Sequence, residues 1–169
     1  MRQIRKTLAV LVLALAPGAA MYAQDAAPGG LVTQRILSLA MAKTIAETAL
    51  AECKAKGAHS AVVVVDRAGQ VLVVLRDEQA GPETVDMARR KAYTARVFHV
   101  PSLEFRESSK GENAGAGLRE VPDILAAGGG VPIKIGNETI GGVGSSGSGQ
   151  ENDDACAKAG IAKVANLLK

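Results

Sequence analysis

Aromatic side chains are almost absent from this sequence. Its 169 residues include two tyrosines, two phenylalanines and no tryptophan. A hydrophobic core must therefore be built from valine, isoleucine, leucine and alanine. A flat aromatic ligand would also find few rings against which to stack.

Cysteine and histidine are equally scarce. The chain has two of each: Cys53 and Cys156, His59 and His99. Their spacing matches neither C-x-x-C nor H-E-x-x-H, and no G-x-S-x-G is present, so the common metal and nucleophile motifs are excluded. Both cysteines fall on apolar sides of predicted helices. We therefore expect two free thiols that pack as small hydrophobic side chains, although an oxidising compartment would permit a disulfide.

The sequence also lacks an apolar run long enough to span a bilayer, which requires about 20 residues. Its longest such run, residues 7–16, follows three basic residues and precedes Pro17-Gly18 and further small residues. This order is typical of a cleaved signal peptide and predicts a periplasmic or secreted protein. A short N-terminal membrane anchor is the alternative, and it is disfavoured because no second apolar segment follows.

Cleavage is expected after Ala20 or Ala23, at the end of a signal over residues 1–23. A flexible lead-in over residues 24–32 then precedes a single domain over residues 33–169. The leader holds three basic residues and no acidic residue, so 17 basic residues face 17 acidic residues in the remainder. The mature protein is close to neutral, which removes the electrostatic basis for binding nucleic acid.

Short apolar runs and amphipathic helical patterns make up the rest of the chain. The expected elements are a helix over 33–56 capped by Thr33, strands over 61–65 and 71–75, a helix from Gly81 to about His99, strands over 131–135 and 139–143, and a C-terminal helix from about Ser148. The runs over 61–65 and 71–75 are uninterrupted and apolar, which predicts two strands buried on both faces. Short turn sequences join each strand pair, which is typical of antiparallel hairpins. Hairpins separated by helices predict an α+β domain with helices packed on an antiparallel sheet.

Two groups of residues could carry chemistry. Arg89-Arg90-Lys91 is either a solvated helix face or an anion site for carboxylates. His99 lies at the end of the same helix, beside Phe98, and is either a packing residue or an iron ligand. The glycine-rich stretch 141–147 could dock an anion, but without a following lysine a tight strand-to-helix turn is favoured.

Several segments together resemble the GlcG/HbpS family, known mainly as haem-binding proteins. They are Val64-Val65-Asp66-Arg67-Ala68-Gly69, Val71-Leu72, Arg76-Asp77, Gly81-Pro82, Ala88-Arg89-Arg90-Lys91-Ala92-Tyr93-Thr94-Ala95, Gly128-Gly129-Gly130-Val131-Pro132-Ile133, Ile140-Gly141-Gly142-Val143-Gly144, and Asp153-Asp154-Ala155-Cys156-Ala157 through Gly160. Each segment is weak alone, but their order along nearly the whole mature chain is specific.

The resemblance implies a profilin-like, three-layer α/β/α fold in which helices cover both faces of a five-stranded antiparallel sheet. The residue patterns account for four strands, and residues 121–125, a short ordered segment, are the candidate for the fifth. The resemblance also implies homo-oligomers, with haem or iron bound outside the cytoplasm by exported members.

Site residues follow from the same resemblance. The haem-contacting segment of exported members corresponds here to Phe98, His99, Pro101 and Ser102, with His99 as the iron ligand. Further cofactor contacts are expected as follows: Arg90 and Lys91 with the haem propionates, and Tyr93 in stacking or hydrogen bonding.

The favoured function is an extracytoplasmic haem-binding protein for scavenging, buffering or sensing. An alternative is an enzyme or accessory protein acting on a small hydroxy- or oxo-acid, as for relatives encoded beside glycolate-utilisation enzymes. A binder is favoured over an enzyme because no convincing acid–base pair is present. A third possibility, resting on the family alone, is a regulatory oligomer that contacts a membrane sensor.

Overall fold

The computed structural model describes residues 29–112 and 115–169. The leader expected over residues 1–23 lies outside the described residues. The helices and strands reported below all belong to the unit Gln34–Lys169.

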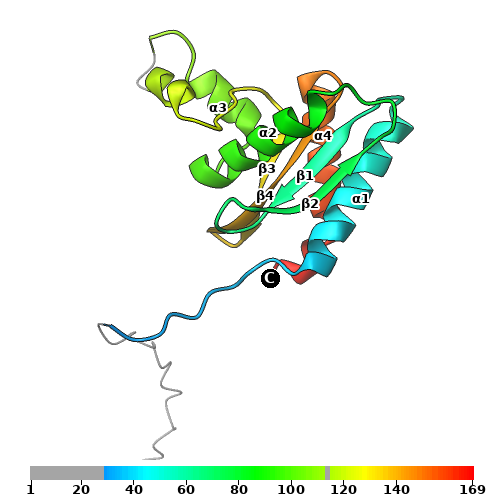
Figure 1. The fold of residues 1–169 in the computed structure, drawn as a ribbon. Helices are drawn as coiled ribbons and strands as arrows, with labels where there is room; N and C mark the ends of the chain where they lie inside the picture. Colours follow the sequence, from blue (N-terminus) through cyan, green and yellow to red (C-terminus); the bar gives the residue numbers. More distant parts are fainter. Residues whose placement is uncertain (1–28, 113–114) are drawn as a thin grey trace, which may run out of the picture. The chain divides into compact units, whose positions relative to one another are not determined.

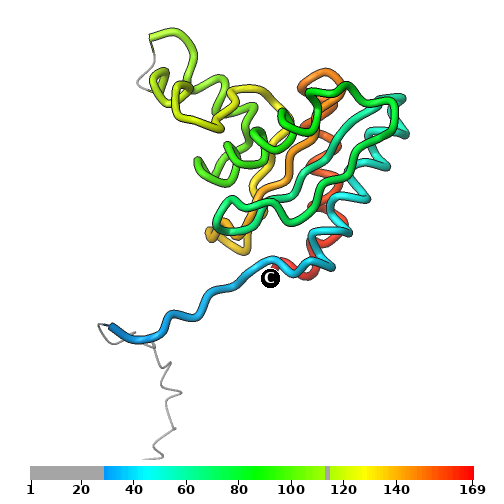
Figure 2. Tube along the Cα trace, in the orientation of Figure 1, coloured from blue at the N-terminus to red at the C-terminus, as the bar shows by residue number. Residues whose placement is uncertain are grey.

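A four-stranded antiparallel sheet forms the middle layer. Its strands are β1 (Ala61–Val65), β2 (Val71–Arg76), β3 (Gly130–Ile135) and β4 (Glu138–Ser146). They lie in the order β2-β1-β4-β3, so the two hairpins meet where β1 pairs with β4 (Figure 2). Both hairpins predicted from the turn sequences are confirmed.

Helices cover both faces of this sheet. On one face lie α1 (Leu39–Ala55) and α4 (Gln150–Lys163), and on the other lies α2 (Thr84–Phe98), followed by the short α3 (Ser102–Ser108) (Figure 1). Two short 3₁₀ segments, Ala116–Glu120 and Ala165–Leu167, complete the elements. The three-layer α+β architecture expected from the sequence is confirmed. No helix within 29–112 or 115–169 is long and apolar enough to cross a membrane.

The central strand β1 shows why an uninterrupted apolar run is needed there. Val62 and Val64 pack in the cluster beneath α1 and α4, whereas Ala61, Val63 and Val65 pack with α2. All five side chains are fully buried. Alternate side chains of a strand point to opposite faces, so a strand covered on both sides needs apolar residues throughout.

Three sequence expectations were wrong in detail. The described residues hold four strands rather than five, and residues 121–125 form no strand. Strand β2 is an edge strand with exposed side chains at Val71 and Val74, not a strand buried on both faces. The first helix is capped by Ser38, whose Oγ accepts a hydrogen bond from the Met41 N–H at 3.2 Å, and not by Thr33.

Glycines in the second hairpin bring α2 unusually close to the sheet. A Cβ on Gly144 would lie 2.0 Å from the carbonyl oxygen of Ala88, and one on Gly142 would lie 2.4 Å from that of Ala92. A Cβ on Gly130 of β3 would lie 2.0 Å from the carbonyl oxygen of Lys91. The helix backbone therefore rests directly on strand backbone, and any larger residue would push it away.

The two cysteines form a disulfide, which corrects the expectation of free thiols. Cys53 of α1 and Cys156 of α4 are completely buried, with their Cα atoms 5.4 Å apart. The apolar helical sides on which they lie were identified correctly. Those sides face each other, however, so the two sulfur atoms meet, and sequence periodicity does not show which helices are neighbours.

Loss of this disulfide should lower the free energy of unfolding by about 2–5 kcal/mol, since the bond closes a long loop in the unfolded chain. The bond joins residues that are 103 positions apart. The Cys53→Ala/Cys156→Ala variant should therefore unfold at lower urea concentration than the oxidised wild-type protein. Reduced wild-type protein serves as the control and should unfold near the variant. Equal midpoints for all three proteins would contradict the prediction.

Candidate functional site

The aromatic and imidazole residues predicted to contact haem lie where α2 ends. Phe98 stacks on Phe105 of α3, with ring centroids 4.2 Å apart and planes 12° apart. His99 follows as the residue that ends α2, in the left-handed backbone conformation (φ 61°), and its side chain is exposed. Among the described residues, its imidazole has no hydrogen-bond or ion-pair partner. The structure therefore places His99 beside an aromatic pair, and within the described residues no hydrogen bond fixes the orientation of its ring.

Tyr93 lies on another side of the helix. Its ring covers Gly69 in the β1–β2 turn, where an added Cβ would lie 2.7 Å from the tyrosine Cε2 atom. Tyr93 and Phe98 are five residues apart, which places them about 140° apart around the helix axis. The two rings therefore do not share one ligand-binding face.

Ser102 is fully buried and holds a glycine-rich turn in place. Its Oγ donates to the Ala127 carbonyl at 2.7 Å and accepts from the Gly130 N–H at 2.8 Å. With one donor and one acceptor position already used inside the protein, this hydroxyl is a structural group in the present conformation.

The three side chains of the basic cluster of α2, Arg89, Arg90 and Lys91, point in different directions and have different partners. Arg89 pairs with Asp86 at 3.0 Å and with Asp123 at 2.7 Å, and hydrogen bonding to Asp123 is the main cause of its raised pKa. Arg90 donates to the carbonyl of Ile124 at 2.8 Å. Lys91 points into the protein. The anion site that three adjacent cations could form is therefore not assembled.

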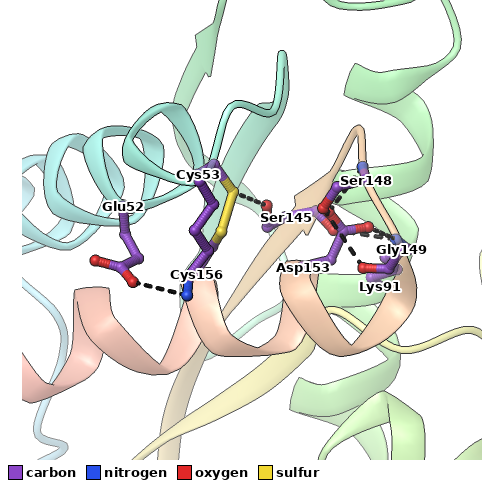
Figure 3. The surroundings of a disulfide bond; sticks show 9 residues. Glu52, Cys53, Lys91, Ser145, Ser148, Gly149, Asp153 and Cys156 are labelled. Atoms are coloured by element: carbon purple, nitrogen blue, oxygen red, sulfur yellow. Dashed lines mark hydrogen bonds and ion pairs between the residues drawn. A yellow bond between two sulfur atoms is a disulfide. The ribbon is translucent and has the colours of Figure 1, made fainter.

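Lys91 is the largest fully buried side chain of the described residues and is only 2% exposed. Its Nζ lies 2.8 Å from Asp153 Oδ2, 3.1 Å from the Ser145 carbonyl and 3.3 Å from Ser146 Oγ (Figure 3). Ser145 also contacts the disulfide, through its Oγ and the Sγ of Cys53 at 3.2 Å. All three ammonium donors are used, so Lys91 joins α2, β4 and α4 and does not reach a haem propionate in this conformation.

Removing this buried cation should be strongly destabilising. Lys91→Met leaves the Asp153 carboxylate buried without its counter-ion, and such changes typically cost about 3–5 kcal/mol. The matched control is Lys110→Met, because Lys110 pairs with Glu107 at the surface, where both side chains are exposed. The control should change the free energy of unfolding, measured in urea, by about 1 kcal/mol or less. Equal stability of the two variants would contradict a structural role for Lys91.

Two cavities in the described residues are not lined by Phe98, His99 or Ser102. The larger, about 440 Å³, is bordered by the β1–β2 turn and by the residues before α1. Its lining residues are Gln34, Ile36, Leu37, Asp66, Arg67, Ala68, Leu72 and Arg96. Arg67 is paired with Glu138, and the pKa of that carboxyl is lowered mainly by hydrogen bonds from Arg67 and Arg35. Arg96 donates through Nε to the Arg67 carbonyl at 2.6 Å. The cations of this cavity therefore already have partners.

The second cavity, about 290 Å³, is a groove between α1 and the end of β2. It is lined by Glu47, Leu50, Ala51, Lys54, Leu75, Arg76, Asp77 and Glu78. We call it the α1–β2 groove. Asp77 lies at its edge and accepts a hydrogen bond from the Nδ1 atom of His59 at 3.0 Å. The groove thus combines apolar walls with a carboxylate-bound imidazole nearby.

The His59–Asp77 pair is the arrangement that the sequence analysis missed. The pKa of the Asp77 carboxyl is lowered, chiefly by a hydrogen bond from the Gln79 N–H and further by His59, while burial opposes this. The signal was available in the predicted hairpin. Because Ala61 pairs with Arg76, the residues just before β1 lie beside those just after β2. His59 and Asp77 occupy those positions.

Comparison with known proteins gives a consistent result. A family model described as "haem degrading protein HbpS-like" matches residues 37–162, from just before α1 to the last turn of α4. An uncharacterised 15.0 kDa protein of Citrobacter freundii, from the dhaT–dhaS intergenic region, is 31% identical over 129 residues, covering 74% of this chain and 89% of that protein.

Two solved structures share the fold. The crystal structure of HbpS is 32% identical, with a TM-score of 0.75, over 79% of this chain and 94% of that one. A crystal structure of a PduOC:heme complex is 26% identical, with a TM-score of 0.71, over 75% of this chain and 94% of that one. The similarity thus extends across the sheet and both helical layers.

Proposed function

Because this chain belongs to the HbpS-like family of haem-degrading proteins, we propose that it binds haem outside the cytoplasm. The observation that carries the proposal is the match of the whole α/β/α domain, which includes a neighbour solved with heme bound. The small-acid alternative drew on the basic cluster of α2 and on the glycine turn before the last helix. The cations of that cluster have separate partners, which removes one of these two supports.

The residues present are compatible with haem. The porphyrin ring needs apolar contacts, and its iron accepts an imidazole nitrogen as an axial ligand. Apolar side chains next to an imidazole occur at the end of α2, where the stacked Phe98 and Phe105 rings lie beside His99. A bound haem would supply the redox-active iron, and the protein's part is to orient one ligand and shield one face of the ring.

The disulfide supports a location outside the cytoplasm. Disulfides persist in oxidising compartments and are rare in the cytosol. The pairing of Cys53 with Cys156 therefore agrees with the export predicted from residues 1–23. The proposal includes scavenging or buffering of haem, because a haem-binding protein outside the cytoplasm would bind haem before it enters the cell.

Self-association is also part of the proposal. Strand β2 is an edge of the sheet with exposed apolar side chains at Val71 and Val74. An uncovered edge strand of this kind favours pairing with another chain. A second copy at this edge would border the α1–β2 groove and could cover more of a bound porphyrin.

Haem binding is tested by titrating the protein, without residues 1–23, with haemin and following the Soret band. A shifted band that saturates at micromolar haemin is expected, because a protein nitrogen replaces water on the iron. The same titration of buffer without protein is the control, and it shows how much of the spectral change comes from haemin alone. An unshifted spectrum throughout the titration would reject the proposed function.

Export is tested separately by expressing the full chain in a Gram-negative host and analysing the periplasmic fraction. Mass spectrometry should find a chain that begins after Ala20 or Ala23, with no free thiol. An Arg2→Glu/Arg5→Glu/Lys6→Glu variant is the control and should stay in the cytoplasm uncleaved. Recovery of the wild-type chain uncleaved and cytoplasmic would contradict export.

A further inference from the structure

The cavity of about 440 Å³ beside the β1–β2 turn has no part in the proposed haem binding, since no histidine lies among the described residues that line it. We infer that this cavity, which we call the turn cavity, binds an amphiphilic monocarboxylate, a molecule with one carboxylate group and an apolar chain. Its volume falls within the range of pockets that enclose small molecules, about 300–1,000 Å³. Binding there does not depend on haem binding, and each is tested separately.

The pairing of β1 with β4 brings two turns together at this end of the sheet. Val65 lies opposite Gly142, so the residues that follow β1 continue beside the first residues of the antiparallel β4. Arg67 of the β1–β2 turn thereby reaches Glu138 at the start of β4, and its Nη1 donates to Glu138 Oε1. A guanidinium from the turn is thus anchored at the wall of the turn cavity.

A second guanidinium comes from the last turn of α2. A Cβ on Gly142 would lie 3.4 Å from the Cβ of Arg96, so the Arg96 side chain begins against the strand. Its Nε donates to the Arg67 carbonyl at 2.6 Å. Arg67 and Arg96 therefore line the same cavity from two elements, and each is held by a contact within the protein. Side chains that are already held in place lose less conformational entropy when a ligand binds.

Both guanidiniums keep hydrogen-bond donors that these contacts do not use. A guanidinium has five N–H donors in a planar fork, which matches the two oxygen atoms of a carboxylate. Arg96 donates through Nε, and within residues 29–112 and 115–169 its Nη groups have no partner. Arg67 donates only through Nη1 in the same part of the chain. Two anchored cations with unused donors therefore line one cavity.

The charges at this end of the domain favour an anion with a single negative charge. Arg35, Arg67 and Arg96 carry three positive charges, whereas Asp66 and Glu138 carry two negative charges. Both carboxylates already accept hydrogen bonds, Glu138 from Arg35 and Arg67, and Asp66 from the backbone of its own turn. One positive charge is therefore left for the carboxylate of a ligand.

Apolar side chains form the rest of the wall of the turn cavity. Leu37 is buried, Leu72 is half-buried, and Ile36 is 74% exposed. The chain of a ligand would cover the isoleucine surface that now contacts water, and burial of apolar surface strengthens binding about fourfold for each methylene group. A carboxylate with an apolar chain therefore fits this wall, whereas glycolate, which has no such chain, would leave it uncovered.

Binding is tested by isothermal titration calorimetry of the protein without residues 1–23, with sodium octanoate as the probe. We expect saturable binding at one site per chain, with a dissociation constant below about 1 mM. Octanol has the chain without the charge, and glycolate has the charge without the chain, so each should bind at least tenfold more weakly. No saturable binding of octanoate, or equal affinity for the three compounds, would overturn the assignment.

Variants test whether octanoate occupies the turn cavity. Arg96→Gln removes one guanidinium and should weaken octanoate binding about 10–100-fold, because hydrogen bonds to a charged group are lost. Arg96→Lys keeps the charge and should recover part of that affinity. Ile36→Ser removes exposed apolar surface and should weaken binding about fourfold or more. Arg89→Gln is the matched control, because Arg89 lies on the same helix and pairs with Asp86 and Asp123. It should bind octanoate as the wild-type protein does.

Circular dichroism verifies that each variant is folded, and haemin titrations separate the turn cavity from haem binding. Octanoate binding that is unchanged in Arg96→Gln, or that is lost in Arg89→Gln, would overturn the assignment to this cavity. The Soret shift of Arg96→Gln should equal that of the wild-type protein. A shift that is lost in Arg96→Gln would assign the cavity to the haem propionates and would overturn a separate ligand.

Discussion

The close contact between α2 and the glycines of β3 and β4 determines much of this structure. Without side chains at Gly130, Gly142 and Gly144, helix backbone rests on strand backbone. At that distance the inward side of the helix favours small residues, and alanines and threonines are five of its six buried residues. A long side chain there must leave along the sheet, and Lys91 does so, ending at Asp153 in the first turns of α4.

This arrangement links the two helical layers through the sheet rather than around it. The Lys91 ammonium and the Cys53 sulfur contact the carbonyl and the hydroxyl of the same residue, Ser145 of β4 (Figure 3). The disulfide then joins α1 to α4 on the far face. The Lys91 ammonium and the Asp153 carboxylate can lie in the interior because they pair with each other and each makes further hydrogen bonds, Lys91 to Ser145 and Ser146 and Asp153 with Ser148. These contacts hold the helices and the sheet together in the interior, and the exposed groups described above lie at the edges of the domain.

The regions available for a ligand lie at those edges. At the end of α2, Phe98 and His99 are accessible, but Lys91 and Ser102, their neighbours in sequence, serve the interior. At the α1–β2 edge, hairpin register brings together an imidazole and a carboxylate from two separate loops.

The sequence alone determined the α+β class, both hairpins and the end of α2 at His99. These features depend on side-chain periodicity, turn residues and charge, all of which are local properties. It did not determine that the cysteines pair, that β2 is an exposed edge, or that Lys91 is internal while His59 meets Asp77. Each of these depends on which elements are neighbours and on where a side chain points around its helix or strand. Only the tertiary structure decided them, because contacts between residues distant in sequence are set by the packing of whole elements and not by the residues on either side.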